Sequence, residues 1–339
     1  MKTTKEYRKK AKRIEKFKNL CNAEQMELKG KLKNILSSMG YKDVKNEDGF
    51  LYAKGDVPVL LLAHMDTVHK TLPFLIKTEI VNDKTKIYSP LGIGGDDRCG
   101  IYMVLEVIKE LKCSVLFTED EEIGGVGATL FAQKDYIDEL DVNYMIEFDR
   151  RGSHDAVFYD CDNEDFEEFI TKEFFKTAWG SFSDISVVAP EAKIAAVNLS
   201  CGYYNAHSTN EYVIFEEMEE VIEQAKRIIK TPVEKPFEYV EAVYSNYGYG
   251  YGYGYGYGYG GYYSSKSGWN NTGSKKYSYL DRFLIYYYNE KGEEASAISE
   301  GFDKSDATFE FLKKHDSIPY KNIITVFSEF QMEQMGLDF

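Results

Sequence analysis

Cysteine is scarce in this chain of 339 residues, and its distribution excludes two common kinds of scaffold. The five cysteines lie far apart, at positions 21, 99, 113, 161 and 201, and no two of them have CxxC spacing. An odd, scattered set predicts neither a disulfide framework nor a zinc ribbon. We therefore expect free thiols and a reducing, cytoplasmic location.

Positive charge and long apolar runs are also in short supply. The chain has 41 Lys and Arg against 56 Asp and Glu, a net charge of -15. Because proteins bind a phosphate backbone through many Lys and Arg contacts, we expect no nucleic-acid partner. The apolar run at Val57–Ala63 is far shorter than the roughly 20 residues of a spanning helix. We therefore expect a soluble protein without a signal peptide or a membrane partner.

The composition and length that are present predict a globular protein with an appendage. Apolar residues make up 43% of the chain, enough to bury a core, and 339 residues suggest two domains or one large domain with an extension. We divide the chain into a basic N-terminal helix (1–23), a main domain (24–240), a Tyr/Gly-rich linker (241–276) and a small C-terminal module (277–339). The first segment is interpreted as a solvated helix, with an arm for an acidic partner as the alternative.

Hydrophobic periodicity in the main domain alternates between the patterns of strands and helices. Strands are expected near residues 50–54, 57–63, 115–117, 144–148, 156–159 and 194–199, and helices near 28–39, 101–111, 166–175 and 215–229. This alternation predicts an α/β fold with a mixed, mostly parallel sheet covered by helices on both faces.

A low-complexity segment separates this domain from the C-terminal module. Seven consecutive Tyr-Gly pairs occupy residues 247–260, and a Ser/Gly/Asn-rich run follows them. Glycine at every second position favours a flexible linker, although alternating aromatic residues could instead mediate adhesion. The module after it, with a strand near 277–288 and a helix opening near Ser305, is expected to be α+β.

Chemically active residues gather where the predicted strands end. His64 follows the strand at 57–63, and Asp66 can accept a hydrogen bond from the N–H of one ring nitrogen, which leaves the other nitrogen for a metal. Further carboxylates follow in the glycine-rich stretch at 92–100 and in the acidic stretch after the strand at 115–117. Asp149 and His207 come after two later strands. His69 and His154 match no ligand position and are interpreted as rim or surface residues.

A set of two histidines and several carboxylates at one edge of a sheet indicates a metal site. Mixed imidazole and carboxylate ligation suits zinc best among common metals, with cobalt or manganese as substitutes. Two such ions with a shared carboxylate and a free glutamate would form a site for metal-assisted hydrolysis.

Five ordered motifs closely resemble those of the co-catalytic dizinc exopeptidases, metallopeptidase families 20, 28 and 42. They are LLLAHMDTV (60–68), GIGGDDRCG (92–100), FTEDEEIGGVGA (117–128), IEFDR (146–150) and NAHSTNEYV (205–213). The resemblance covers about residues 24–235. It implies the catalytic core alone, because the intervals at 69–91 and 150–206 are too short for the inserted lid domain that families 20 and 42 carry.

The resemblance also implies a role for each motif residue. His64 and Asp149 would hold one Zn²⁺, Glu122 and His207 a second, and Asp96 would bridge them. Asp66 would orient His64, and Glu121 would be the general base toward a metal-bridging water. The peptide bond after Asp96 is often cis in this superfamily.

The favoured interpretation is an aminopeptidase that acts on short peptides. An amidase or deacylase of N-acyl amino acids is a second hypothesis, because the superfamily includes such enzymes. A third is a binding or adhesion protein that uses the Tyr-Gly segment and the C-terminal module. The complete ligand set and Glu121 argue against this third hypothesis, because a scaffold needs no general base. Oligomeric state is left open.

Overall fold

The computed structural model describes residues 4–73, 75–242, 281–289, 291–301, 304–315, 318 and 322–328. The chain divides into two compact units, residues 1–261 and 262–339. The Tyr-Gly repeat lies outside the described residues, so its role as a linker stays a prediction. No helix in the part of the chain that is described is long and apolar enough to cross a lipid bilayer.

The first unit is built on a mixed sheet with the strand order β1-β2-β6-β3-β7-β10-β8-β9. Its central strands β6, β3, β7 and β10 are parallel to one another, and β2 and β8 pair antiparallel on either side of them. The strands are β1 (Lys45–Glu47), β2 (Phe50–Ala53), β3 (Val57–His64), β6 (Cys113–Thr118), β7 (Tyr144–Arg150), β8 (Asp155–Val157), β9 (Lys176–Thr177) and β10 (Ala196–Ser200). The carboxyl ends of the four parallel strands meet at one edge.

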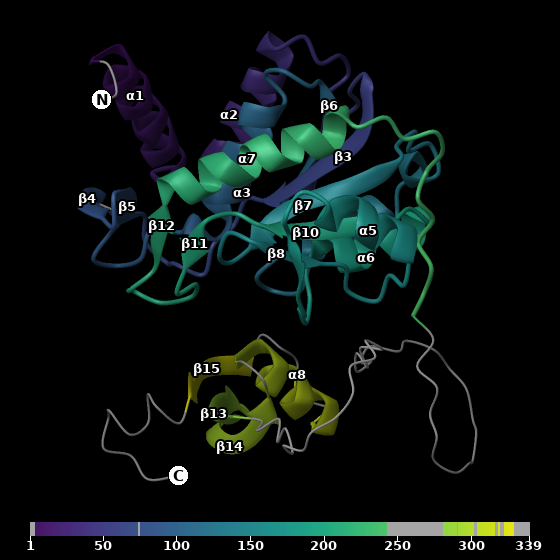
Figure 1. Ribbon diagram of the computed structural model, residues 1–339. Coiled ribbons are helices and arrows are strands. Elements are labelled where there is room, and N and C mark those ends of the chain that lie inside the picture. The colour runs from purple at the N-terminus through teal and green to yellow at the C-terminus, as the bar shows by residue number, and fades with distance from the viewer. Residues whose placement is uncertain are drawn as a thin grey trace, which may run out of the picture. The chain divides into compact units, whose positions relative to one another are not determined.

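Helices cover both faces of this sheet (Figure 1). Alternate residues of β3 separate the two cores: Leu61 and Ala63 join one cluster and Leu60 and Leu62 the other. The first cluster includes α2 (Gln25–Ser38), α3 (Gly95–Val107), α5 (Glu164–Thr171) and α7 (Phe215–Lys230), whereas α4 (Val126–Ala132) and α6 (Asp184–Ala192) pack in the second. A short 3₁₀ helix spans Asp135–Ile137.

A second, small sheet joins two segments that are distant in the sequence. The hairpin β4 (Lys77–Val81) and β5 (Lys84–Tyr88) pairs through β5 with β12 (Tyr212–Ile214), and β12 pairs with β11 (Tyr203–Tyr204). Because β5 pairs with β12, this sheet places the chain just before the glycine-rich stretch at 92–100 beside the segment that contains His207. The sequence patterns did not predict it, because its strands are short.

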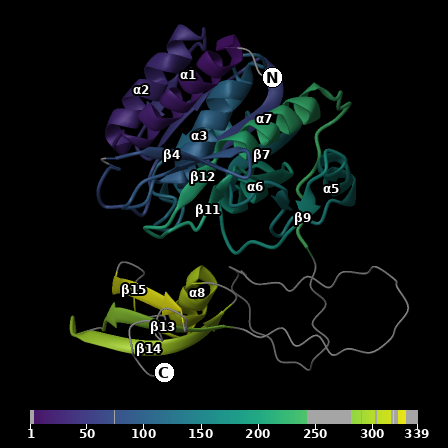
Figure 2. The ribbon, with the colours of Figure 1, turned by 60° about the vertical axis from the view of Figure 1, so that its left-hand side comes forward.

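The N-terminal helix α1 (Thr4–Cys21) differs from the solvated segment expected at residues 1–23. Phe17, Leu20 and Cys21 are buried in the main core, and the Phe17 ring packs edge-on against Tyr102 of α3 with ring centroids 5.8 Å apart. Figure 2 shows α1 and α2 on the side of the sheet that α3 and α7 cover, and α1 contacts α3. The packed region therefore begins within α1 rather than near Glu24.

The second unit is a small α+β module. Its antiparallel sheet has the order β14-β13-β15, formed by β13 (Asp281–Tyr288), β14 (Glu294–Gly301) and β15 (Ile323–Ser328). Helix α8 (Lys304–Lys314) contributes Phe311 to a core with Ile285 and Ile318.

Both parts of the fold-class prediction are confirmed: a mixed, mostly parallel sheet with helices on both faces, and a small C-terminal α+β module. Helices α4 and α6 and the small sheet of the first unit were not among the expected elements.

Candidate active site

The residues singled out in the five motifs come together at the carboxyl edge of the parallel strands. His64 is the last residue of β3, and Asp149 is near the end of β7. Glu121 and Glu122 lie in the loop after β6, and His207 follows β10 and β11. Asp96 lies at the start of α3, whose N-terminus points toward this edge. The strand order thus brings side chains separated by more than 140 residues into one site.

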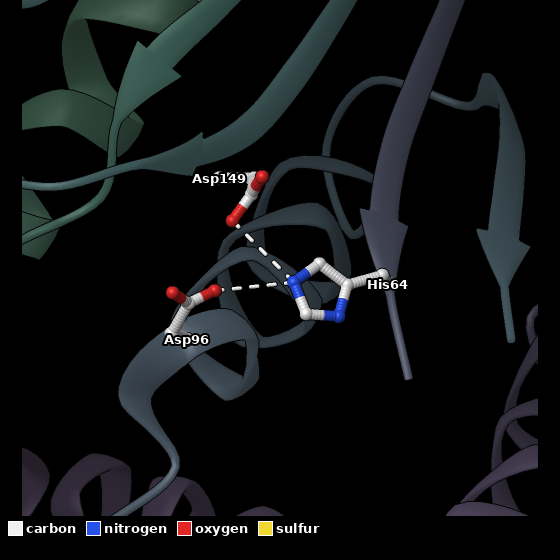
Figure 3. A group of neighbouring side chains, drawn as sticks. All are labelled: His64, Asp96 and Asp149. Carbon is white, nitrogen blue, oxygen red and sulfur yellow. Dashed lines mark hydrogen bonds and ion pairs between the residues drawn. The ribbon is translucent and has the colours of Figure 1, made fainter. Parts of the chain in front are cut away.

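The first group contains His64, Asp96 and Asp149. His64 Nε2 lies 3.1 Å from Asp96 Oδ1 and 3.4 Å from Asp149 Oδ1 (Figure 3). The His64 side chain is fully buried, so this nitrogen faces two carboxylates with no access to bulk water. One potential ligand atom from each residue lies within 4.8 Å of the others.

The second group contains Asp96, Glu122 and His207. His207 Nε2 lies 3.0 Å from Glu122 Oε2 and 3.2 Å from Asp96 Oδ2. Asp96 therefore belongs to both groups, with Oδ1 directed to His64 and Oδ2 to His207. The peptide bond between Asp96 and Asp97 is cis, as the resemblance implies.

Asp66 connects His64 to the loop that carries the two glutamates. Its Oδ1 lies 3.1 Å from His64 Nδ1 and accepts the backbone N–H of Glu121 at 3.0 Å, while Oδ2 accepts the N–H of Glu122 at 3.0 Å. Because Nδ1 donates to this carboxylate, the lone pair of His64 remains at Nε2, toward Asp96 and Asp149. One side chain thus orients a histidine and the neighbouring acidic loop.

Glu121 and Glu122 are adjacent in sequence but differ in their surroundings. Glu122 belongs to the second group, whereas Glu121 belongs to neither. No side-chain hydrogen bond to the Glu121 carboxylate is present among the described residues. Burial and the charges of Asp149 and Glu122 raise the pKa of Glu121 well above its usual value, although His64 offsets part of this increase.

The electrostatics of the site favour added positive charge. Burial lowers the pKa of His207, but hydrogen bonds to Asp96 and Glu122 outweigh burial and raise the pKa to about 12. Burial and the charge of Asp96 raise the pKa of Asp149 to about 7. Within the described residues, Glu122 Oε1 is shielded from solvent and has no hydrogen-bond partner. This donor set fits divalent cations, which neutralise clustered carboxylates and take imidazole nitrogens as ligands.

A polar network lies behind Asp149 and includes Ser183 of the Gly180–Asp184 stretch, which the motif resemblance places near the substrate pocket. Ser183 Oγ lies 3.2 Å from Asp149 Oδ2 and also bonds the buried Glu147, and Asn198 donates to Ser183 Oγ at 3.0 Å. Asn198 Oδ1 in turn accepts the backbone N–H of Asp149 at 2.9 Å. The Gly180–Asp184 loop containing Ser183 therefore contacts the site, but nothing in its local sequence pairs Ser183 with Asp149.

Tyr203 and Arg98, which lie near the site, bond backbone oxygens rather than the ligand side chains. Tyr203 is buried and donates its hydroxyl to the backbone oxygen of Asp149 at 3.1 Å. Arg98 is 2% exposed and donates to the backbone oxygens of Met65, at 2.5 Å, and Ala23, at 3.1 Å. All five cysteines are free and buried.

Part of the chain matches a known family of peptidases. The model of peptidase family M28 matches residues 51–193. Of the two ligand groups, this range includes His64, Asp96, Glu122 and Asp149 but not His207. Residues 51–193 are therefore similar to peptidase family M28. The resemblance drawn from the motifs is confirmed over this range, and the match supports a metal-dependent peptidase.

Two solved structures share the fold of the first unit. Aminopeptidase PepT from Bacillus cereus aligns with a TM-score of 0.51 and 17% identity, over 64% of this chain and 97% of that chain. A tripeptidase from Staphylococcus aureus aligns with a TM-score of 0.50 and 17% identity, again over 64% and 97%. At this identity the likeness establishes the fold alone. A search of curated protein sequences gave no match.

Proposed function

We propose that this exopeptidase-fold chain is an aminopeptidase of short peptides that holds two Zn²⁺ ions. The observation that carries the proposal is the sharing of Asp96 between two ligand groups, with Glu121 beside them and outside both. His64 and Asp149 would hold one ion, Glu122 and His207 the other. Co²⁺ or Mn²⁺ could substitute, because the same nitrogen and oxygen donors accept them.

Bound at this site, the two cations would supply Lewis acidity for the scissile carbonyl and lower the pKa of water. The residues of the chain supply orientation and proton transfer. Asp66 keeps the His64 Nε2 lone pair directed at the site and holds the backbone of the acidic loop. The carboxylate of Glu121 accepts a proton from the attacking water and then donates it to the leaving amine.

Among the described residues, the intervals between the motifs hold no inserted lid domain. Residues 69–91 provide the β4–β5 hairpin as their only secondary structure among the described residues, and residues 150–206 provide short elements that belong to the core. The two solved structures with this fold are named as an aminopeptidase and a tripeptidase, which favours release of residues from short peptides.

The proposal is tested by metal analysis and a substrate panel. We expect about two zinc ions per chain, and we expect chelation to abolish hydrolysis that zinc or cobalt restores. Aminoacyl-nitroanilides and dipeptides should be cleaved in preference to N-acyl amino acids. Cleavage of the acylated compounds alone would instead establish a deacylase, and binding of metal without hydrolysis of any compound would favour a binding protein.

Matched variants test the sharing of Asp96. Replacing His207 with Ala should lower the zinc content by about one ion, because its ligand group serves one ion. Replacing Asp96 with Ala should impair both sites at once. Full zinc occupancy in the Asp96→Ala protein would show that this carboxylate does not bridge the ions.

A further inference from the structure

We infer that Glu211 is a positioning residue that holds the Asp96 turn in place, and that His69 completes this clamp. The inference rests on the proposed function, because it assigns Asp96 as the shared ligand. The sequence assigned neither residue a role in the site: Glu211 lies in the NAHSTNEYV motif but was given no function, and His69 matched no ligand position. The geometry links them across 142 residues of sequence.

Glu211 is a buried carboxylate that three donors surround. It is 1% exposed, and its Oε1 accepts the backbone N–H of Asp96 at 3.0 Å. Its Oε2 accepts the N–H of Gly94 at 2.8 Å and lies 2.8 Å from His69 Nε2. Two of these three bonds hold the main chain at the shared ligand, Asp96, and two residues before it.

The glycine-rich turn has the shape that this clamp requires. Gly92 has φ +87°, and a Cβ there would overlap the His69 ring. A Cβ on Gly95 would lie 2.9 Å from Val213 Cγ2 and 3.3 Å from Glu211 Oε1. The turn is therefore enclosed by the loop after β3 on one side and by the start of β12 on the other, with no room for side chains between them.

Glu211 also connects the segment that contains His207 to the turn that contains Asp96. Glu211 lies four positions after His207, and its own N–H donates to the backbone oxygen of Ser208 at 3.2 Å. The segment that contains His207 is thus fastened by Glu211 to the turn that contains Asp96. A shift of Glu211 would change the separation of these two ligands, which must approach one ion together.

A carboxylate suits this position better than an amide. All three neighbours present hydrogen-bond donors, and a carboxylate has acceptor capacity on both oxygens. A glutamine would place its NH₂ group against at least one N–H, because only one of its two terminal atoms accepts. The nearby guanidinium of Arg98 provides compensating positive charge.

The decisive experiment measures zinc affinity in the full-length chain by competition with a fluorescent chelator, together with thermal unfolding of the metal-free proteins. Glu211→Gln should weaken zinc binding by about 10- to 100-fold, the usual effect of removing an outer hydrogen-bond partner of metal ligands. Glu216→Gln is the matched control. The carboxylate of Glu216 also accepts hydrogen bonds from a cation, the Lys10 ammonium, and from a backbone N–H, that of Thr85. It contacts no residue of the site. We expect its zinc affinity to equal that of the wild type.

A second pair of variants keeps the test valid if Glu211→Gln fails to fold. His69→Gln retains a donor near the Nε2 position and should keep wild-type affinity, whereas His69→Leu should lose about fivefold, the share of one hydrogen bond. If the role were merely structural, the variants would lower the unfolding temperature of the metal-free protein. Zinc affinity measured well below that temperature would then be unchanged. Equal zinc affinity in the two His69 variants, or wild-type affinity in folded Glu211→Gln, would overturn the inference. Failure of the wild-type chain to bind zinc would instead overturn the proposed function.

Discussion

Asp66 shows how a single side chain can give two adjacent glutamates different roles. It holds the backbone N–H groups of Glu121 and Glu122 with separate oxygens, both at 3.0 Å. With the backbone fixed in this way, Glu122 reaches His207 and Glu121 does not join either ligand group. A base must be near the reacting water without being used as a ligand, and this geometry fits Glu121 to that role.

We predict that Glu121→Gln and Glu122→Gln lose activity by different routes. Glu121→Gln should retain both metal ions and the fold and lose about two to four orders of magnitude in turnover, the usual contribution of acid–base catalysis. Glu122→Gln should weaken one metal site, because a neutral amide is a poor zinc ligand. Zinc content and dipeptide turnover measured side by side distinguish the two. Near-normal hydrolysis by zinc-loaded Glu121→Gln would refute the proposed mechanism.

At the scale of secondary structure, α1 combines a charged sequence with a buried apolar edge. Lys10, Arg13 and Lys16 pair with acidic residues of α7 and α3, while Phe17 enters the core. High positive charge in the sequence suggested a solvated helix because the acidic partners lie 90 or more positions away. The helix is therefore part of the first unit's core rather than an appendage of it.

Phe17→Ala should destabilise the first unit by about 3–5 kcal/mol, the range for removing a fully buried aromatic side chain. Tyr7→Ala on the same helix is the control: Tyr7 is 65% exposed, and its loss should change stability by less than about 0.5 kcal/mol. Urea unfolding followed by circular dichroism measures both. Equal stability of the two variants would show that α1 does not contribute to the core.

At the scale of the whole molecule, the proposed catalytic residues all belong to one of the two units. His64 through His207 lie within residues 1–261, and the module at 262–339 has its own core around Ile285 and Phe311. The domain boundaries drawn from the sequence, including the linker at 241–276, stay predictions. They lead to a direct test by truncation.

A chain that ends at residue 244 should fold, bind the same amount of zinc and keep most of its activity on dipeptides. The reason is that every ligand, Glu121 and the Glu211 clamp lie before that point. Activity, zinc content and thermal unfolding of the truncated and full-length chains provide the comparison. A large fall in dipeptide turnover with zinc still bound would show that the C-terminal module contributes to the substrate site.

The sequence alone predicted the class of fold, and it marked the histidines and carboxylates that the structure brings together in two groups. Strands such as β3 and β7 are marked by apolar runs, and His64, Asp96 and Asp149 lie in motifs whose order along the chain is informative. Each strand and each motif is local, because it depends on residues within about ten positions of one another. Only the order of the motifs extends along the chain. Their meeting at one edge follows from the parallel arrangement of the strands, which the alternation of strands and helices predicts.

Only the tertiary structure decided which additional residues support the site. The bond of Glu211 to Asp96, the contact of His69 with Gly92 and the burial of Phe17 each join segments far apart in the sequence. Such contacts leave no periodicity or spacing in the local sequence, because a carboxylate looks the same whether it faces water or a buried N–H. Strand order and the packing of the loops determine these partners, and both arise when the whole chain has folded.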